Sequence, residues 1–160
     1  MKIEILHRLI KMSIVNANDI NAHNIESDYG GIFMANEKIT AVLQTIVTTL
    51  SQQADGHQIQ SRIFASEGFS KLADKYAEHA EEERGYVTKC IDRLLDLSGE
   101  VKLEAKPEGP IYKDSVEYLK YDLSVSTDAE GLAGMHDVIS IATKEDYSSY
   151  DILKETLIKS

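Results

Sequence analysis

The sequence has one cysteine, two prolines and no long apolar run, and each shortage excludes a class of structure. Cys90 stands alone among 160 residues, which excludes an internal disulfide framework and a zinc site built from cysteines. A single cysteine is also compatible with a reducing compartment such as the cytoplasm or an organelle matrix. No apolar run approaches the length of about 18 residues that a membrane span requires. Pro107 and Pro110 stand close together, so the rest of the chain is open to long helices.

Basic residues are also scarce. The chain has 17 Lys and Arg against 27 Asp and Glu, which gives a formal net charge of −10 at pH 7. This balance argues against non-specific binding to nucleic acid or to an anionic membrane. It is typical of a protein that stays in solution or attracts cations. Hydrophobic residues make up 42 % of the chain, which predicts a folded domain and excludes disorder along its whole length.

Two long helices are predicted in the first two thirds of the chain. In residues 36–66, apolar side chains follow the spacing of one helical face. The Asp55-Gly56 pair within this range predicts a break or bend near Gly56, since glycine costs roughly 1 kcal/mol in a helix. Residues 69–97 show the clearest stripe: Phe69, Leu72, Ala73, Tyr76, Ala80, Glu83, Val87, Cys90, Ile91 and Leu94. Glu83 is the one carboxylate on it, so we expect a partner such as Tyr86 or a neighbouring cation.

The second half of the chain predicts a crossover and two more helices. Residues 98–113 hold both prolines and are long for a link between adjacent helices, so we expect them to cross the length of the molecule. Asp114 with Glu117 resembles a capping box, and it predicts a helix over residues 115–142. The landmarks along this predicted helix are Val116, Leu119, Leu123, Ser126, Glu130, Val138 and Ile141. A polar turn at 144–146 precedes a final helix, and the absence of alternating apolar residues indicates an all-α fold.

The first 33 residues divide into an apolar segment and an irregular one. Residues 2–15 hold eight aliphatic or thioether side chains behind a positive start, which suggests either a targeting leader or a helix packed on the bundle or a partner. Glu4 and the lack of a small-residue cleavage site favour the helix, with Ile3, Leu6, Leu9 and Ile10 beside Leu153 and Leu157. Four asparagines and two adjacent glycines predict irregular structure over 16–33. The expected division is therefore 1–33 and 34–160.

Three stretches of the chain carry a family resemblance: 68–99, 116–123 and 146–153. Residues 68–73 read Gly-Phe-Ser-Lys-Leu-Ala, residues 79–83 read His-Ala-Glu-Glu-Glu, and residues 91–99 continue as Ile-Asp-Arg-Leu-Leu-Asp-Leu-Ser-Gly. Together they resemble the second helix of bacterioferritins, while 116–123 and 146–153 resemble the starts of the third and fourth helices. The resemblance covers about residues 36–160. It implies a ferritin-like antiparallel four-helix bundle with a long crossover and a shortened last helix, to which this chain adds the N-terminal helix.

The same resemblance implies iron chemistry whose ligands are mostly missing here. The family oxidises Fe(II) at a di-iron site built from a Glu on the first and third helices and a Glu-x-x-His pair on the second and fourth. The matching positions are Leu50, Glu83, Tyr86, Ser126 and Ser160, with the last His beyond the end of the chain and the haem-binding Met replaced by Arg84. One of six ligands survives, and a lone carboxylate cannot hold two iron ions. We therefore expect a degenerate ferroxidase site in a non-catalytic structural or assembly subunit.

Other interpretations remain open at this point. The chain is alternatively an iron-storage or oxidative-protection ferritin subunit. If the ferritin topology holds, His57, His79 and Asp122 lie about one turn from the lost centre, close to Glu83. Two imidazoles and a carboxylate suit zinc or iron, whereas the same residues also suit a buried polar layer without a cofactor. The expected partners are proteins, in a homo- or hetero-oligomer, and not nucleic acid.

Overall fold

In the part of the chain that it describes, the structure, a computed structural model, consists of helices joined by a tight turn and an extended crossover. That part comprises residues 28–98, 100–126, 139–140, 142–144 and 146–158. Its helices are α2 (Asp28–Ser66), α3 (Ser70–Ser98), α4 (Ser115–Ser126) and α6 (Tyr147–Ile158). No strand occurs in these ranges, which confirms the all-α prediction. The predicted N-terminal helix at 2–15 and the predicted irregular segment up to residue 27 lie outside them.

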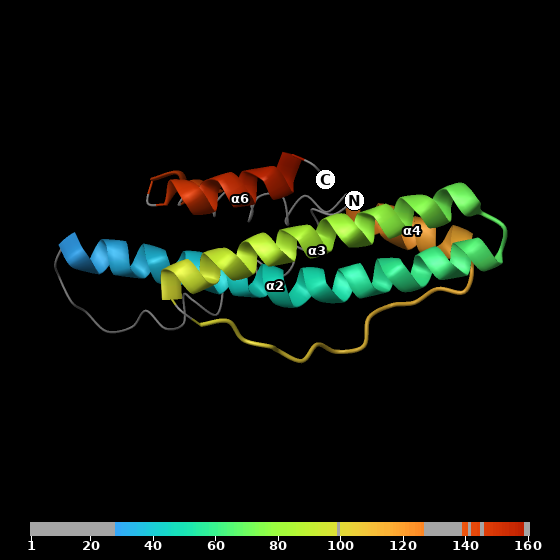
Figure 1. Cartoon of the computed structure of the whole chain (residues 1–160), viewed down its shortest axis with the longest axis horizontal. Helices are drawn as coiled ribbons and strands as arrows, with labels where there is room; N and C mark the ends of the chain where they lie inside the picture. The colour runs from blue at the N-terminus through green and yellow to red at the C-terminus, as the bar shows by residue number, and fades with distance from the viewer. Residues whose placement is uncertain (1–27, 99, 127–138, 141, 145, 159–160) are drawn as a thin grey trace.

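The longest helices, α2 and α3, form an antiparallel hairpin and lie side by side along most of their length (Figure 1). Gly68 makes the turn with φ of 87°, a conformation that L side chains rarely adopt. Its N–H donates to the carbonyl of Ala65 at 3.1 Å, and the N–H of Phe69 donates to that of Phe64 at 2.9 Å. This pair of bonds is a Schellman motif, which satisfies the last carbonyls of α2. Phe69 was expected on the buried stripe, but it precedes α3 and is 49 % exposed.

Helix α2 differs from the prediction in two places. It runs without interruption through Gly56, so the predicted break is wrong. Ala54 and His57 lie close to this glycine in sequence, and both are buried. The helix continues because packing of this face contributes more free energy than a single glycine costs. The helix also begins at Asp28, so the prediction of irregular structure at 28–33 is wrong. Extending an existing helix adds a hydrogen bond for each residue that is fixed, which offsets the low propensity of Gly30 and Gly31.

The crossover runs along α2 and returns the chain to the hairpin end. The side chain of Gln44 on α2 makes two hydrogen bonds to the backbone of Lys102. Its amide nitrogen donates to the Lys102 carbonyl and its amide oxygen accepts from the Lys102 N–H, both at 2.9 Å. Four turns further along α2, Gln60 donates to the carbonyl of Tyr112 at 3.2 Å. Figure 1 shows this segment passing from the end of α3 to the start of α4. The predicted lengthwise connection is confirmed.

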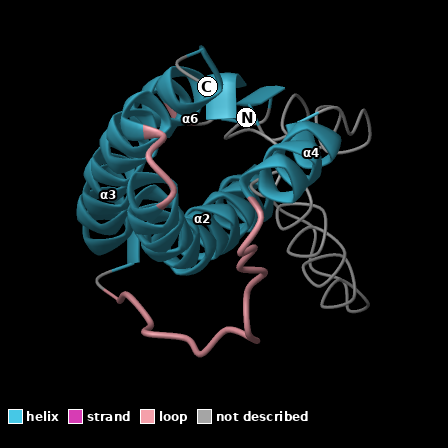
Figure 2. Ribbon diagram, turned by 90° about the vertical axis from the view of Figure 1, so that its right-hand side faces the viewer, coloured by secondary structure: helices cyan, strands magenta, loops and turns pink. Residues whose placement is uncertain are grey.

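The two shorter helices begin at aspartates. The N–H of Glu117 donates to Asp114 Oδ1 at 2.9 Å, which confirms the predicted cap of α4. The N–H of Ser149 donates to Asp146 Oδ1 at 3.2 Å in the same way at the start of α6. Arg93 of α3 also donates to Asp146, at 2.7 Å. This contact attaches α6 to α3, and the two helices lie next to each other in Figure 2.

The buried face of α4 is not the predicted one. Val116 and Leu123 are 59 % and 65 % exposed, whereas Tyr118 and Asp122 are buried. The aromatic ring of Tyr118 packs among other rings. The carboxylate of Asp122 accepts a hydrogen bond from the Tyr76 hydroxyl, which offsets part of the cost of its burial. Of the predicted helix over 115–142, the structure describes Ser115–Ser126 and, beyond residue 138, short helical pieces.

Two clusters of buried side chains fill the described part of the molecule. The larger, here called the apolar cluster, joins the first half of α2 to the last turns of α3 and to α6. Its fully buried members include Leu43, Ile46, Cys90, Leu94 and Leu153. Burial raises the pKa of the Cys90 thiol to about 12, which suits an inert core side chain. The smaller, here called the aromatic cluster, lies at the hairpin end and contains Phe64, Ala73, Tyr76 and Tyr118.

Candidate functional site

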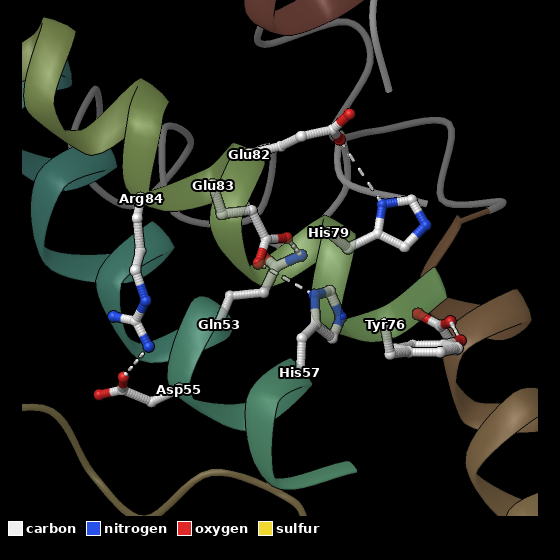
Figure 3. A network of polar contacts seen from close by, with 9 residues as sticks. Gln53, Asp55, His57, Tyr76, His79, Glu82, Glu83 and Arg84 are labelled. Carbon is white, nitrogen blue, oxygen red and sulfur yellow. Dashed lines mark hydrogen bonds and ion pairs between the residues drawn. The ribbon is translucent and has the colours of Figure 1, made fainter. Parts of the chain in front are cut away.

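A layer of buried polar side chains separates the two clusters. Gln53 and His57 project from one face of α2, since residues four apart on a helix are neighbours, and Glu83 faces them from α3 (Figure 3). The Gln53 amide nitrogen donates to Glu83 Oε1 at 2.9 Å. The Nδ1 atom of His57 lies 2.9 Å from Glu83 Oε2. Both oxygens of a fully buried carboxylate are therefore engaged by α2.

This pairing is what permits Glu83 to be buried. An isolated carboxylate in the interior is very costly, and amide and imidazole N–H groups replace the water that it loses. His57 donates from Nδ1 either as one neutral tautomer or as the imidazolium. The next residue, Arg84, is directed away from Glu83 and pairs with the exposed Asp55 at 2.8 Å (Figure 3). The internal partners of Glu83 thus come from α2, not from the neighbouring guanidinium.

The layer continues from His57 into the aromatic cluster. The His57 ring meets the Tyr76 ring edge-on, with ring centroids 5.3 Å apart. The centroid of the His79 ring lies 6.1 Å from that of the His57 ring. The hydroxyl of Tyr76 donates to Oδ2 of Asp122, a carboxylate that α4 supplies. Burial raises the pKa of Asp122 above its usual range, and the Tyr76 hydrogen bond opposes that shift without cancelling it. Burial, followed by the Asp122 hydrogen bond, also raises the pKa of Tyr76.

The structure brings the four predicted metal ligands into this one layer, but does not arrange them around a point. Glu83 contacts His57, whereas the Tyr76 ring stands between His57 and Asp122. His79 Nδ1 lies 3.8 Å from an oxygen of Glu82 on the same helix. Within the described ranges, no three His, Cys, Asp or Glu side chains are placed to hold a metal ion. The observed arrangement is a hydrogen-bonded polar layer.

Two further positions that the resemblance assigns to the iron site lie in apolar surroundings. Leu50 and Tyr86 are both buried in the apolar cluster. The ammonium of Lys89 lies 5.5 Å from the centre of the Tyr86 ring. Neither position supplies a carboxylate or an imidazole. Ser126 is the last residue of α4, and Ser160 lies outside the described part of the chain.

Sequence reasoning missed two members of the layer. Gln53 was not considered, although its spacing of four residues from His57 indicates a shared helical face. Tyr76 was read as a core residue, and its role as hydrogen-bond partner of Asp122 depends on how α4 packs. A spacing rule therefore finds the first residue, whereas the second requires knowledge of a contact between helices that are distant in sequence.

Across the described residues, a long helical hairpin, a lengthwise crossover and a buried polar layer between helices are features of a helical bundle. The family model described as a ferritin-like domain matches residues 36–160, so the chain belongs to the ferritin-like family. Among curated proteins and among solved structures, neither comparison gives a significant match. None of the helices in the described ranges combines the length and the hydrophobicity needed to cross a bilayer.

Proposed function

We propose that this ferritin-family protein has a degenerate di-iron site and acts as a non-catalytic structural or assembly subunit. The observation that carries the proposal is the state of Glu83. Gln53 and His57 take up both of its oxygens inside the protein, at 2.9 Å each. A carboxylate that binds iron would have to give up these partners, and no second carboxylate faces it from Leu50 or Tyr86.

Charge accounting supports the same conclusion. Two Fe(II) ions carry a total charge of +4, and hard divalent cations require several anionic oxygen ligands. By the resemblance to bacterioferritins, four carboxylates supply that charge, of which Glu83 alone remains in this sequence. Removing water from two cations without matching anions is unfavourable. The layer around Glu83 therefore serves packing between α2 and α3.

The assembly role extends to parts of the bundle beyond this layer. In the proposed architecture, the four helices form an antiparallel bundle, and residues 2–15 add a helix that packs on it or on a partner. The salt bridge between Arg93 and Asp146 supports docking of α6 on α3. Val116 and Leu123 leave an apolar surface on α4, which favours protein partners in a homo- or hetero-oligomer.

A second proposal is a zinc or iron ion held by His57, His79, Asp122 and Glu83, as in a ferritin subunit that still handles metal. The gathering of these side chains in one layer favours it. It also has a structural cost, because Asp122 would have to leave Tyr76 and His57 would have to leave Glu83. Each of these changes would leave a buried polar group without its present hydrogen-bond partner.

Native mass spectrometry of the full chain after anaerobic addition of Fe(II) or Zn(II) separates these proposals. The structural role predicts a defined oligomer that retains no metal in stoichiometric amount. Two iron ions per chain would contradict it. One ion per chain that is lost in Glu83→Gln, and kept in the exposed control variant Glu81→Gln, would support the second proposal instead.

A further inference from the structure

Four tyrosines form a continuous line of ring contacts from the surface to the polar layer. Tyr112 and Tyr121 are partly exposed, and their ring centroids are 5.1 Å apart. They lie 5.9 Å and 6.2 Å from the ring of Tyr118, which is buried. Tyr118 lies 5.5 Å from Tyr76, which is 2 % exposed. This set, here called the tyrosine path, joins α3, α4 and the end of the crossover.

The inner end of the tyrosine path has a proton acceptor. Removing one electron from a phenol makes its O–H strongly acidic, so oxidation of a buried tyrosine requires a group that takes the proton. The Tyr76 hydroxyl already donates to Asp122 Oδ2. Tyr76 therefore has what a stable oxidised tyrosine requires: an acceptor in place and shelter from solvent.

We infer that the tyrosine path is a one-electron relay that carries an oxidising equivalent from the protein surface to Tyr76. Its oxidant is a diffusible radical, for which an organic peroxyl radical is the chemical class. The peroxyl radical takes one electron from Tyr112 or Tyr121 and one proton from solvent, and becomes a hydroperoxide. An electron from Tyr76 then refills the outer ring through Tyr118.

The proton balance closes at Asp122. As Tyr76 loses its electron, its O–H bond breaks and a new O–H bond forms on Asp122 Oδ2. The outer tyrosine regains any proton that it released to water, so it ends unchanged. The products are a hydroperoxide, a neutral Tyr76 phenoxyl radical and a protonated Asp122. Because Tyr76 is buried, its radical cannot meet a second tyrosyl radical and couple with it.

This activity does not depend on iron or on the state of Glu83. It is tested on the full chain with photogenerated tris(bipyridine)ruthenium(III) as the one-electron oxidant and freeze-quenched electron paramagnetic resonance as the readout. The relay predicts a long-lived phenoxyl signal in the unaltered protein. Tyr76→Phe removes the residue that carries this radical and should abolish the long-lived signal. Asp122→Asn removes the proton acceptor and should shorten the lifetime about tenfold or more, as expected from losing a hydrogen bond to a charged group. Tyr147→Phe, an exposed tyrosine on α6 outside the path, should leave it unchanged.

A measurement on the unaltered chain guards against variants that fail to fold. Because formation of the radical moves the Tyr76 proton, the signal should appear more slowly in D₂O than in H₂O. Circular dichroism melting of each variant establishes that it is folded before its lifetime is compared. Equal rates in the two solvents would overturn the relay, and so would a folded Tyr76→Phe protein that keeps the full lifetime.

Discussion

The two halves of the α2–α3 hairpin bury different kinds of side chain by different means. At the half that contains the start of α2, the apolar cluster packs aliphatic side chains such as Leu43, Leu50 and Leu94. Beyond Gln53, the same helices bury the Glu83 carboxylate, the His57 imidazole and the Tyr76 phenol, each of which has a polar partner. The first half depends on helical spacing alone, whereas the second depends on which side chains meet across helices.

The largest effect is expected where a polar partner is removed. His57→Ala leaves the buried carboxylate of Glu83 with the Gln53 amide alone, so we expect the free energy of unfolding to fall by about 3–5 kcal/mol. Urea denaturation measures it. The double variant His57→Leu/Glu83→Leu should recover much of the loss, because it removes both members of the pair. A loss below about 1 kcal/mol in the single variant would show that the pair does not matter for stability.

The apolar half offers a matched pair of adjacent leucines. Leu94 is fully buried, whereas Leu95 is 50 % exposed. Leu94→Ala should lower the free energy of unfolding by about 2–5 kcal/mol through lost burial and an unfilled cavity. Leu95→Ala should change it by about 0.5 kcal/mol or less. Equal losses in the same denaturant series would mean that the assignment of the buried face of α3 is wrong.

A smaller, pH-dependent effect is expected at the junction of α3 and α6. Partial burial alone would raise the pKa of Asp146, but hydrogen bonds from Arg93 and Ser149 hold it below the usual range. Its contribution to stability is therefore complete above the unfolded-state pKa of about 3.9, and is lost as the pH falls through the lower folded-state value. Asp146→Asn keeps a capping side chain and should cost about 1 kcal/mol at pH 7.

Denaturation of both proteins from pH 7 down to pH 2 provides the check for Asp146. The difference in unfolding free energy between the unaltered chain and Asp146→Asn should shrink as the solution becomes more acidic. A difference that stays constant over this range would mean that the charge of Asp146 contributes nothing.

The smallest effect belongs to the exposed pair beside the polar layer. Arg84 and Asp55 are 2.8 Å apart, but both side chains are largely in solvent, where an ion pair contributes about 0–1 kcal/mol. Thermal unfolding of Arg84→Ala should differ little from that of the unaltered chain, and less in high salt. Arg93→Ala, which loses the more buried partner Asp146, is the contrasting variant and should be the less stable of the two.

Much of the fold was predictable because it follows from local patterns. Periodic apolar residues located α3 to within one residue at each end, and the proline-rich segment predicted the crossover. Helix α4 shows where this reasoning fails. Val116 and Leu123 fit a helical stripe, yet Tyr118 and Asp122 are the buried residues, since their partners lie on α2 and α3. A polar side chain becomes a core residue only when another element supplies its hydrogen bond.

Some residues of the polar layer were predictable from the sequence, whereas the hydrogen bonds between them were not. Glu83 on an apolar stripe correctly indicated a buried carboxylate, because such a position requires a partner. The identity of that partner depends on the axial register of α2 against α3, which sets Gln53 and His57 opposite Glu83. A one-dimensional pattern contains no information about this register.

Oxidation of Fe(II) in air tests the central claim most directly. Stopped-flow absorbance after mixing the chain with two equivalents of Fe(II) should show no fast phase in proportion to the protein. Glu83→Ala and the surface variant Glu82→Ala should give the same slow trace. A fast stoichiometric phase that Glu83→Ala abolishes and Glu82→Ala retains would contradict the account, because it would show that Glu83 exchanges Gln53 and His57 for iron.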